Sequence, residues 1–256
     1  MKQITSVVRL ERQQDGVAVL TMIKEKTLNA LDEPFLVELL EKLKEAEADD
    51  NIRVVILTGI GRGFCSGVDL TGGLLQDNAE KLDDWIKQFG NPVVAYIRTM
   101  TTVVIAAVNG VAVGAGVSLA LACDIVISAT SARYFLSFAK IGMAMDMGIS
   151  WILTRRIGPM RTAALTMSAG FLDAEAALQC GLCYEVVDDA ELMSQSCKFA
   201  SRIASQSAPA LQALKSQINF ADTATLAEVL GHEAKIQGRL VQTEQAQQLI
   251  KEFLPR

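Results

Sequence analysis

The sequence predicts an α/β fold in which a mixed core is followed by a helical module. Two observations favour this class. Strand patterns and helical patterns alternate through the first part of the chain, and the pattern is mostly helical from Gly148 onward. The segments 54–57 and 103–108 are unbroken apolar runs, which is typical of strands covered on both faces. A chain of 256 residues, 50% of them apolar, is long enough to bury one large core.

Each element is expected from its own pattern. Strands are expected where apolar residues alternate with polar ones or form short uninterrupted runs: 7–10, 17–23, 54–57, 103–108, 125–127 and 184–187. Helices are expected where apolar residues recur on one face or where a helix start signal occurs: 34–48, 77–98, 116–122, from Pro159, from Asp173, 191–206, 208–220, 225–240 and 243–253. Because no low-complexity linker separates the two parts, we expect a core at residues 1–195 and a helical module at 196–256.

Charge and composition argue against several classes of partner. The net charge is −5 and no basic stripe with interleaved aromatic residues occurs, so we expect no nucleic-acid partner. No apolar run reaches the roughly 18 residues of a membrane span. Residues 1–11 alternate like a strand and carry no signal-peptide pattern. We therefore expect a cytoplasmic protein with no membrane partner.

Side chains suited to metal binding or nucleophilic catalysis are few. The five cysteines occupy apolar or helical contexts, which indicates buried free thiols. Cys180 and Cys183 have the spacing of a metal-binding pair, but a zinc site needs two more ligands. The single histidine, His232, is far away in the sequence. We therefore expect no metal ion, and one histidine also argues against Ser–His or Cys–His catalysis.

Three segments have the composition of an acid–base site. Asp146 is the one acid in the apolar and small-residue stretch 141–152, where burial raises a carboxyl pKa and suits the group to accept and return a proton. The glycine-punctuated segments 64–70 and 109–116 could aim backbone N–H groups at an oxyanion. Each segment also has an ordinary interpretation: a strand-to-helix loop, a close-packed helix of small residues and, for Asp146, a helix N-cap.

In combination these segments resemble the crotonase superfamily, the enoyl-CoA hydratase/isomerase family, over nearly the whole chain. The motifs that carry the resemblance are Leu28-Asn29-Ala30-Leu31, Phe64-Cys65-Ser66-Gly67-Val68-Asp69-Leu70, Ala106-Ala107-Val108-Asn109-Gly110 through Gly114-Ala115-Gly116, Cys123-Asp124-Ile125, Ile141-Gly142, and Ala174-Glu175-Ala176-Ala177 with Gly181-Leu182. The resemblance implies a crotonase-like spiral of ββα units with a C-terminal helical trimerisation module. It implies an acyl-CoA thioester substrate, a homotrimer or homohexamer, and no cofactor beyond the coenzyme A of the substrate.

The resemblance also implies site residues. An oxyanion hole would be formed by the N–H groups of Val68 and Ala115, and family members usually carry glycine at the second position. Asp146 lies four residues after Gly142, in the slot where Δ3,Δ2-enoyl-CoA isomerases, dienoyl-CoA isomerases and ring epoxide isomerases of the phenylacetate pathway place a lone acid. The residues implied to bind CoA and the acyl chain are Lys24, Lys26, Leu28, Val68, Asp69, Leu70, Thr71, Ala115, Ser118 and Phe138.

Two departures from the family pattern favour one reaction. Ser118 and Phe138 stand where hydratases carry two glutamates that hold and split the attacking water, and neither replaces a carboxylate. We therefore interpret the chain as an isomerase of lipid or fatty acid metabolism that moves a 3-enoyl-CoA double bond to position 2, with Asp146 carrying the proton. Two alternatives stay open: another enzyme of the family, such as a hydratase-like lyase or a hydrolase, and a non-catalytic acyl-CoA-binding member.

Overall fold

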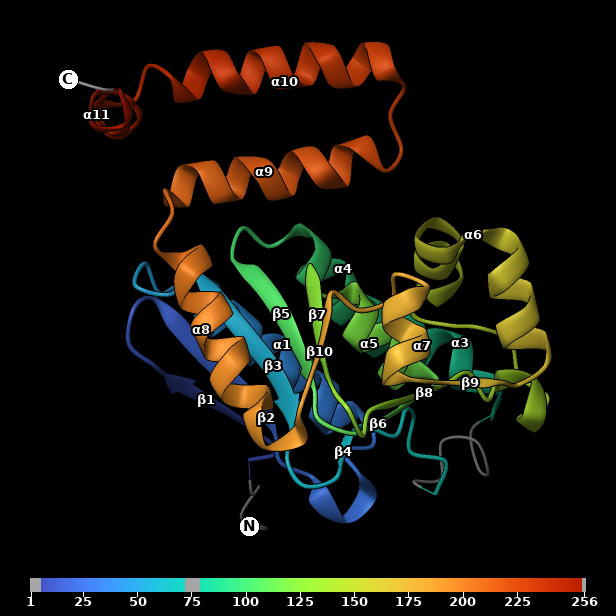
Figure 1. Cartoon of the computed structure of the whole chain (residues 1–256). Helices are drawn as coiled ribbons and strands as arrows, with labels where there is room; N and C mark the ends of the chain where they lie inside the picture. The colour runs from blue at the N-terminus through green and yellow to red at the C-terminus, as the bar shows by residue number, and fades with distance from the viewer. Residues whose placement is uncertain (1–5, 72–78, 255–256) are drawn as a thin grey trace.

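The computed structural model describes residues 6–71 and 79–254, which form two sheets surrounded by helices (Figure 1). In the described residues the larger sheet has six strands, in the order β1 (Val8–Arg12), β2 (Val17–Met22), β3 (Val54–Gly59), β5 (Val103–Val108), β7 (Ile125–Ala129) and β10 (Glu185–Val187). The smaller sheet has the order β4 (Gly63–Cys65), β6 (Val111–Val113), β8 (Arg133–Phe135) and β9 (Phe171–Asp173). The pairs β1–β2 and β8–β9 are antiparallel, and the other strand pairs of these two sheets are parallel.

The chain builds both sheets by repeating one unit. β3, β5 and β7 belong to the larger sheet, and each continues through a short turn into β4, β6 or β8 of the smaller sheet. Helical structure comes after each pair, because a parallel neighbour can be reached only through a crossover connection. The three repeats form the expected spiral of ββα units.

Helices lie on both faces of the larger sheet and extend beyond it (Figure 1). In the described residues they are α1 (Glu33–Glu47), α3 (Leu82–Trp85), α4 (Asn91–Thr99), α5 (Ala115–Ala122), α6 (Ile149–Met167), α7 (Ala174–Gln179), α8 (Leu192–Ala204), α9 (Ala208–Ala221), α10 (Leu226–Leu240) and α11 (Glu244–Phe253). A π-helical turn, Ile86–Gly90, joins α3 to α4 inside the expected helix 77–98, whose first two residues lie outside the described part. The expected start at Pro159 is confirmed, because Gly158 (φ 80°) breaks α6 one residue earlier.

The larger sheet separates two apolar layers. On one face its side chains pack with those of α1, α4, α5 and the smaller sheet in the main core. On the other face, Val19, Ile56 and Ile105 pack against Ala200 and other residues of α8. The boundary expected at residue 196 falls within α8, and the helices that project from the core begin with α9 (Figure 1).

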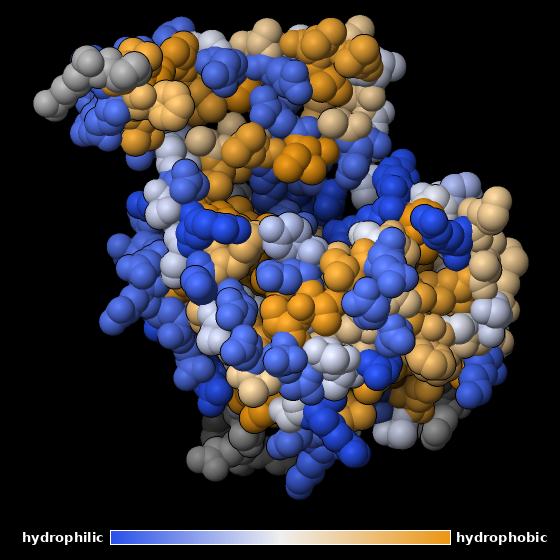
Figure 2. Space-filling model, in the orientation of Figure 1, coloured by the Kyte–Doolittle hydropathy of each residue, from blue (hydrophilic) through white to orange (hydrophobic). Residues whose placement is uncertain are grey.

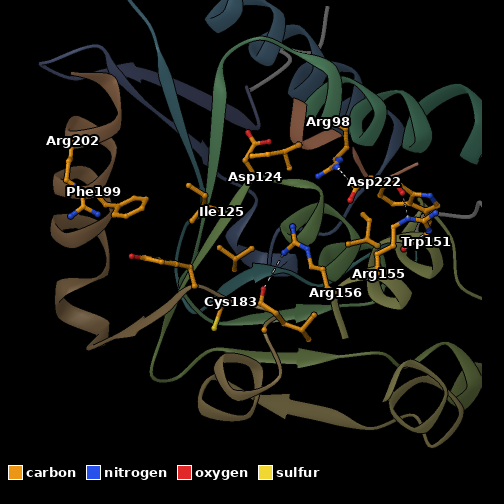
Figure 3. A pocket seen from close by; sticks show the side chains of 16 residues that line it. Arg98, Asp124, Ile125, Trp151, Arg155, Arg156, Cys183, Phe199, Arg202 and Asp222 are labelled. Atoms are coloured by element: carbon orange, nitrogen blue, oxygen red, sulfur yellow. Dashed lines mark hydrogen bonds and ion pairs between the residues drawn. The ribbon is translucent and has the colours of Figure 1, made fainter. Parts of the chain in front are cut away.

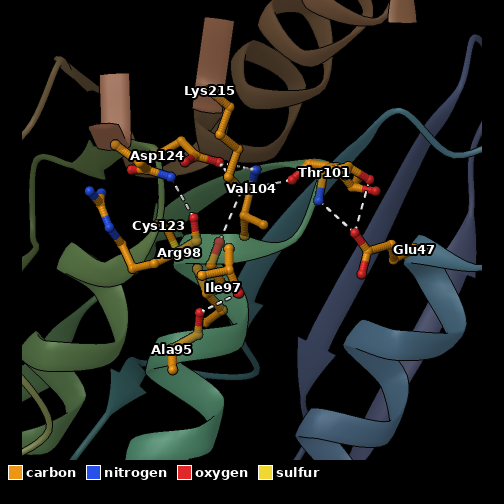
Figure 4. Close-up of polar contacts among 12 residues, drawn as sticks. Glu47, Ala95, Ile97, Arg98, Thr101, Val104, Cys123, Asp124 and Lys215 are labelled. Carbon is orange, nitrogen blue, oxygen red and sulfur yellow. Dashed lines mark hydrogen bonds and ion pairs between the residues drawn. The ribbon is translucent and has the colours of Figure 1, made fainter. Parts of the chain in front are cut away.

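A buried lysine anchors α9 to the core. Lys215 donates from Nζ to the carbonyls of Ile97 and Thr102, each at 2.9 Å, and forms a 2.8 Å ion pair with Asp124 (Figure 4). Asp124 also accepts a 2.8 Å hydrogen bond from the Val104 N–H at the start of β5. Every donor of this ammonium group therefore finds an acceptor, which is what a buried charge requires.

Beyond this anchor the last helices are exposed. No described residue of α10 or α11 is buried, and apolar side chains such as Leu226, Leu230 and Phe253 lie on the surface. Figure 2 shows orange patches on these helices and a hollow between α9 and the core. Among the described residues, no helix is both long enough and apolar enough to cross a membrane.

The Lys215 anchor predicts a large stability effect. Lys215→Ala removes the ammonium group and leaves the Asp124 carboxylate and two carbonyls buried without it. We expect the free energy of unfolding to fall by about 3–5 kcal/mol in urea titrations. Lys198→Ala, on the exposed face of α8, is the matched control and should change it by less than about 0.5 kcal/mol. Equal effects of the two substitutions would contradict this role.

Candidate active site

The first loop of the site is held by a buried asparagine. Asn29 donates from Nδ2 to the carbonyls of Gly63 (2.8 Å) and Phe64 (3.1 Å) in β4, and its Oδ1 accepts from the Lys24 N–H at 2.9 Å. Leu28 and Asn29 both have positive φ, of 53° and 59°, which turns the chain sharply back toward β4. Loop 24–31 is therefore fixed against the strand that precedes the site.

Val68 lies in the segment directly after β4. The Leu31 N–H donates to Gly67 O at 2.8 Å, and the Asp69 N–H donates to Leu31 O at 2.9 Å. These bonds hold the backbone on both sides of Val68, whose own N–H donates to no acceptor among the described residues. Gly67 has φ 86°, and a Cβ built on it would lie 2.6 Å from Val113 O. Only glycine fits here, because a side chain would push the two segments apart.

Ala115 is the first residue of α5, so its N–H has no partner within the helix. The Gly114 N–H donates to Phe135 O at 2.9 Å, but the Ala115 N–H, like that of Val68, has no acceptor in the described part of the chain. A Cβ on Gly116 would lie 2.2 Å from Cys65 O, so α5 begins in direct contact with β4. Burial raises the pKa of the Cys65 thiol at this contact to about 12.

Both segments line one cavity of about 90 Å³. Asp146 faces it, and no other charged side chain of the described residues lines it. The remaining lining is apolar or carries small hydroxyl groups and glycine: Ser66, Gly67, Val68, Leu70, Leu82, Val113, Gly114, Ala115, Ser137, Phe138, Ile141 and Met143. The cavity thus combines two unused amide donors with one carboxyl group in a largely apolar wall.

The Asp146 carboxyl has few partners. Its Oδ1 is buried without a hydrogen bond among the described residues. Burial raises the pKa of Asp146 to about 6, and a hydrogen bond from its own backbone N–H lowers the pKa only in part. The side chain does not cap α6, since Gly148 occupies the N-cap position and makes no side-chain bond. A carboxyl with this pKa can exist as a base or an acid near neutral pH.

Ser118 and Phe138 occupy different places around Asp146. Ser118 is fully buried on α5, behind the cavity wall, and its Oγ donates to the backbone carbonyl of Asp146 at 3.4 Å. Phe138 lines the cavity, and its ring lies 3.7 Å from where a Cβ of Gly114 would be. Neither residue provides a carboxylate, so Asp146 is the acid–base group that the described cavity contains.

The other residues expected to bind CoA separate into two groups. Leu70 lines the cavity and is 46% exposed at its edge. Asp69 organises the segment after Val68: it accepts from the N–H (2.9 Å) and Oγ1 (2.7 Å) of Thr71 and lies 3.8 Å from the Lys24 ammonium group, which also contacts Asp32 at 2.5 Å. Lys26 and Leu28 belong to loop 24–31, with Lys26 exposed and Leu28 half-buried, and neither lines the cavity.

Sequence reasoning missed part of the cavity wall. Leu82 comes from α3, a segment without a recognisable motif, and Val113 ends the short strand β6. The apolar periodicity of the helical segment was the available signal for Leu82, but it does not tell which apolar side chains face a cavity.

A larger cavity of about 570 Å³ lies beside α6, α8 and α9, away from Asp146 (Figure 3). The guanidinium groups of three arginines that line this cavity already have partners within the protein. Arg98 pairs with Asp222 at 2.9 Å, and the Arg155 guanidinium stacks 4.1 Å above the Trp151 ring. Arg156 donates to the carbonyls at the end of α5, with Leu121 O at 2.9 Å. These arginines connect α6, α9 and the core.

The ββα spiral is the fold that the resemblance to the crotonase superfamily predicts. The sequence model of the enoyl-CoA hydratase/isomerase family matches residues 12–256, and the chain belongs to this family. The 1,2-epoxyphenylacetyl-CoA isomerase of Escherichia coli K12 is 39% identical over 85% of this chain and 84% of that protein. The 2,3-dehydroadipyl-CoA hydratase of the same strain is 31% identical over 95% of this chain and 94% of its own length.

A solved structure supports the same fold. The crystal structure of an enoyl-CoA hydratase from Bacillus anthracis superimposes with a TM-score of 0.93 at 28% identity, covering 97% of this chain and 96% of that one. The relatives include both hydratases and an isomerase, so the comparisons support an acyl-CoA hydratase/isomerase without distinguishing the two reactions.

The raised pKa of Asp146 predicts a pH-dependent cost in stability. The folded state holds the Asp146 proton up to about pH 6, whereas the unfolded chain releases it near pH 4. Stability relative to an Asp146→Asn variant should therefore fall as pH rises through this window, by about 2–3 kcal/mol between pH 4 and pH 8. Urea titrations of both proteins at several pH values measure this difference in the free energy of unfolding. A stability difference between Asp146→Asn and the parent protein that does not change with pH would refute the prediction.

Proposed function

We propose that this protein is an acyl-CoA isomerase that moves a double bond from position 3 to position 2 of an enoyl-CoA. The observation that carries the proposal is the lone Asp146 carboxyl in a cavity that also presents the unused N–H groups of Val68 and Ala115. One carboxyl group is sufficient for this reaction, because the same proton leaves one carbon and returns to another.

The proposed mechanism uses the two amides as oxyanion donors and Asp146 first as the base and then as the acid. The thioester oxygen accepts hydrogen bonds from the N–H groups of Val68 and Ala115. The Asp146 carboxylate removes a proton from C2, and the electron pair moves onto the thioester oxygen as a dienolate, which the two donors stabilise. The protonated Asp146 then returns the proton to C4, and the double bond forms between C2 and C3. One oxyanion donor is worth about 3–4 kcal/mol of the barrier.

The walls of the cavity support isomerisation over hydration. Hydration needs a second acid–base group to hold and split a water molecule. Phe138 has no hydrogen-bonding group, and Ser118 is directed to the Asp146 carbonyl from behind the wall. Apolar walls also keep water from the dienolate and strengthen the field of the two amides.

One observation favours a second candidate substrate, a ring epoxide. The relative with 39% identity is named a 1,2-epoxyphenylacetyl-CoA isomerase, and its reaction also rearranges a CoA thioester without adding water. Assays with a 3-enoyl-CoA, with 1,2-epoxyphenylacetyl-CoA and with a 2-enoyl-CoA in water separate isomerisation, epoxide rearrangement and hydration.

We also propose that the protein needs no cofactor beyond the CoA of its substrate, and that α9–α11 assemble it into a homotrimer or homohexamer. The exposed apolar residues of α10 and α11, among them Leu226, Leu230 and Phe253, support an assembly role for these helices. Lys24 and Lys26 on loop 24–31 are proposed to face the phosphates of CoA.

The catalytic role of Asp146 has a direct test. Asp146→Asn keeps the size of the side chain but cannot accept the C2 proton, so we expect kcat for 3-enoyl-CoA isomerisation to fall about 10²–10⁴-fold. Binding of a non-reactive acyl-CoA, measured by calorimetry, should stay within about threefold. Asp84→Asn, on the exposed side of α3, should leave both quantities unchanged. Normal turnover by Asp146→Asn would end the proposal.

The pH dependence of turnover is set by the same carboxyl. Because Asp146 acts as the carboxylate and its pKa is raised to about 6, kcat should be level above that pH and should fall about tenfold for each pH unit below it. Steady-state kcat values between pH 4.5 and pH 8.5 measure this fall, which is the acidic limb of the pH profile. A limb near pH 4 would show that a carboxyl of ordinary pKa, and not Asp146, is titrating.

A further inference from the structure

The direction of the Asp146 carboxyl is set without a hydrogen bond to Oδ1 and without a donor from another residue in the described part of the chain. Its Oδ1 has no hydrogen-bond partner in the described residues, and the one bond that affects its pKa comes from its own N–H. A donor from another side chain would fix the carboxylate but would also stabilise its charge and weaken it as a base. The orientation must therefore come from the backbone.

That backbone is in an unusual conformation. Met147 has φ 46°, in the left-handed region that side chains other than Asn and Asp seldom adopt, and it is 2% exposed. Gly148 comes next, with φ 75°. Two successive left-handed residues thus separate Asp146 from α6, and a non-glycine residue persists there only when its surroundings hold it.

Three contacts hold this backbone: one is made by the Met147 side chain and two by the adjoining Asp146 carbonyl. A Cβ built on Gly90 would lie 3.1 Å from Met147 Cγ and 3.2 Å from its Sδ, so the Met147 side chain packs directly on Gly90. Gly90 ends the π-helical turn between α3 and α4, and such turns occur often at functional sites. The Asp146 carbonyl accepts from the Ile149 N–H of α6 at 3.1 Å and from Ser118 Oγ of α5 at 3.4 Å.

We propose that Met147 and Gly90 form a positioning pair that aims the Asp146 carboxyl into the cavity through the backbone. The proposal rests on the proposed role of Asp146 as the base. Met147 is a positioning residue, because it touches the π-helical turn and does not line the cavity. A Cβ at position 90 requires the Met147 side chain to move by a few tenths of an ångström, and truncation of Met147 removes the packing that holds its left-handed backbone.

Nearby charges do not set the direction of Asp146. The charged side chains on the elements that pack around residues 146–148 are Asp83, Asp84, Lys87, Arg98, Lys140, Arg155, Arg156 and Arg161. None of them lines the cavity, and burial is the cause that raises the Asp146 pKa.

Two substitutions with matched controls test the pair. Gly90→Ala brings a methyl group against Met147, and Met147→Ala removes the packing on Gly90 while keeping a non-glycine residue at positive φ. We expect each to lower kcat about 10- to 100-fold while KM changes less than about threefold, because the carboxyl and not the substrate site is displaced. The controls are Gly231→Ala, a helical glycine with nothing within 4 Å of a Cβ, and Met160→Ala, a methionine of α6 that is 84% exposed. Met147→Leu, which keeps the packing volume, should retain kcat within about threefold.

A readout independent of turnover separates positioning from general destabilisation. Carboxyl-carbon NMR of Asp146 should show that its pKa falls below about 6 in both test variants, because a released carboxyl reaches water. In the controls and in Met147→Leu the Asp146 pKa should stay at about 6. An unchanged Asp146 pKa with a loss of kcat that only tracks melting temperature would overturn the positioning pair. Normal turnover by Asp146→Asn would instead overturn the proposed base, whatever Gly90→Ala does.

Discussion

The site depends on the absence of side chains at two positions. A Cβ on Gly67 would lie 2.6 Å from Val113 O, and one on Gly116 would lie 2.2 Å from Cys65 O. Those contacts bring the end of β4 and the start of α5 together, which is why the amides of Val68 and Ala115 face one cavity. The ββα repeats supply the two parallel strands, β4 and β6, and the glycines let the segment after β4 approach the start of α5 closely.

Asp146, which lines the same cavity, is an exception to the rule that buried polar groups are hydrogen-bonded. Asp146 is buried with an unsatisfied oxygen, an arrangement that costs stability and that most buried polar groups avoid. Its cost is offset by the main core and by anchors such as Lys215, which are far from the cavity and fully hydrogen-bonded. The Lys215 anchor is thus fully hydrogen-bonded, whereas the Asp146 acid–base group is left nearly unsatisfied.

Much of the core could be predicted from the sequence, because strands β3 and β5 are continuous apolar runs. The three-residue strands of the smaller sheet could not, since so short a segment has no measurable period. Asp146 was found as an isolated acid, but whether it capped α6 or faced a cavity depended on Gly148 taking the cap position. The left-handed conformation of Met147 could not be predicted from the sequence, because methionine does not favour it.

Cys65 shows a further consequence of the contact between β4 and α5. A 2-enoyl thioester is an electrophile that thiolates attack at C3, and this cysteine is part of the strand that leads to the cavity. Only the thiolate form is nucleophilic. Burial, which raises the pKa of Cys65 to about 12, keeps the sulfur protonated and out of contact with solvent. The same close packing that assembles the amide pair thus protects the protein from alkylation by the compound it is proposed to release.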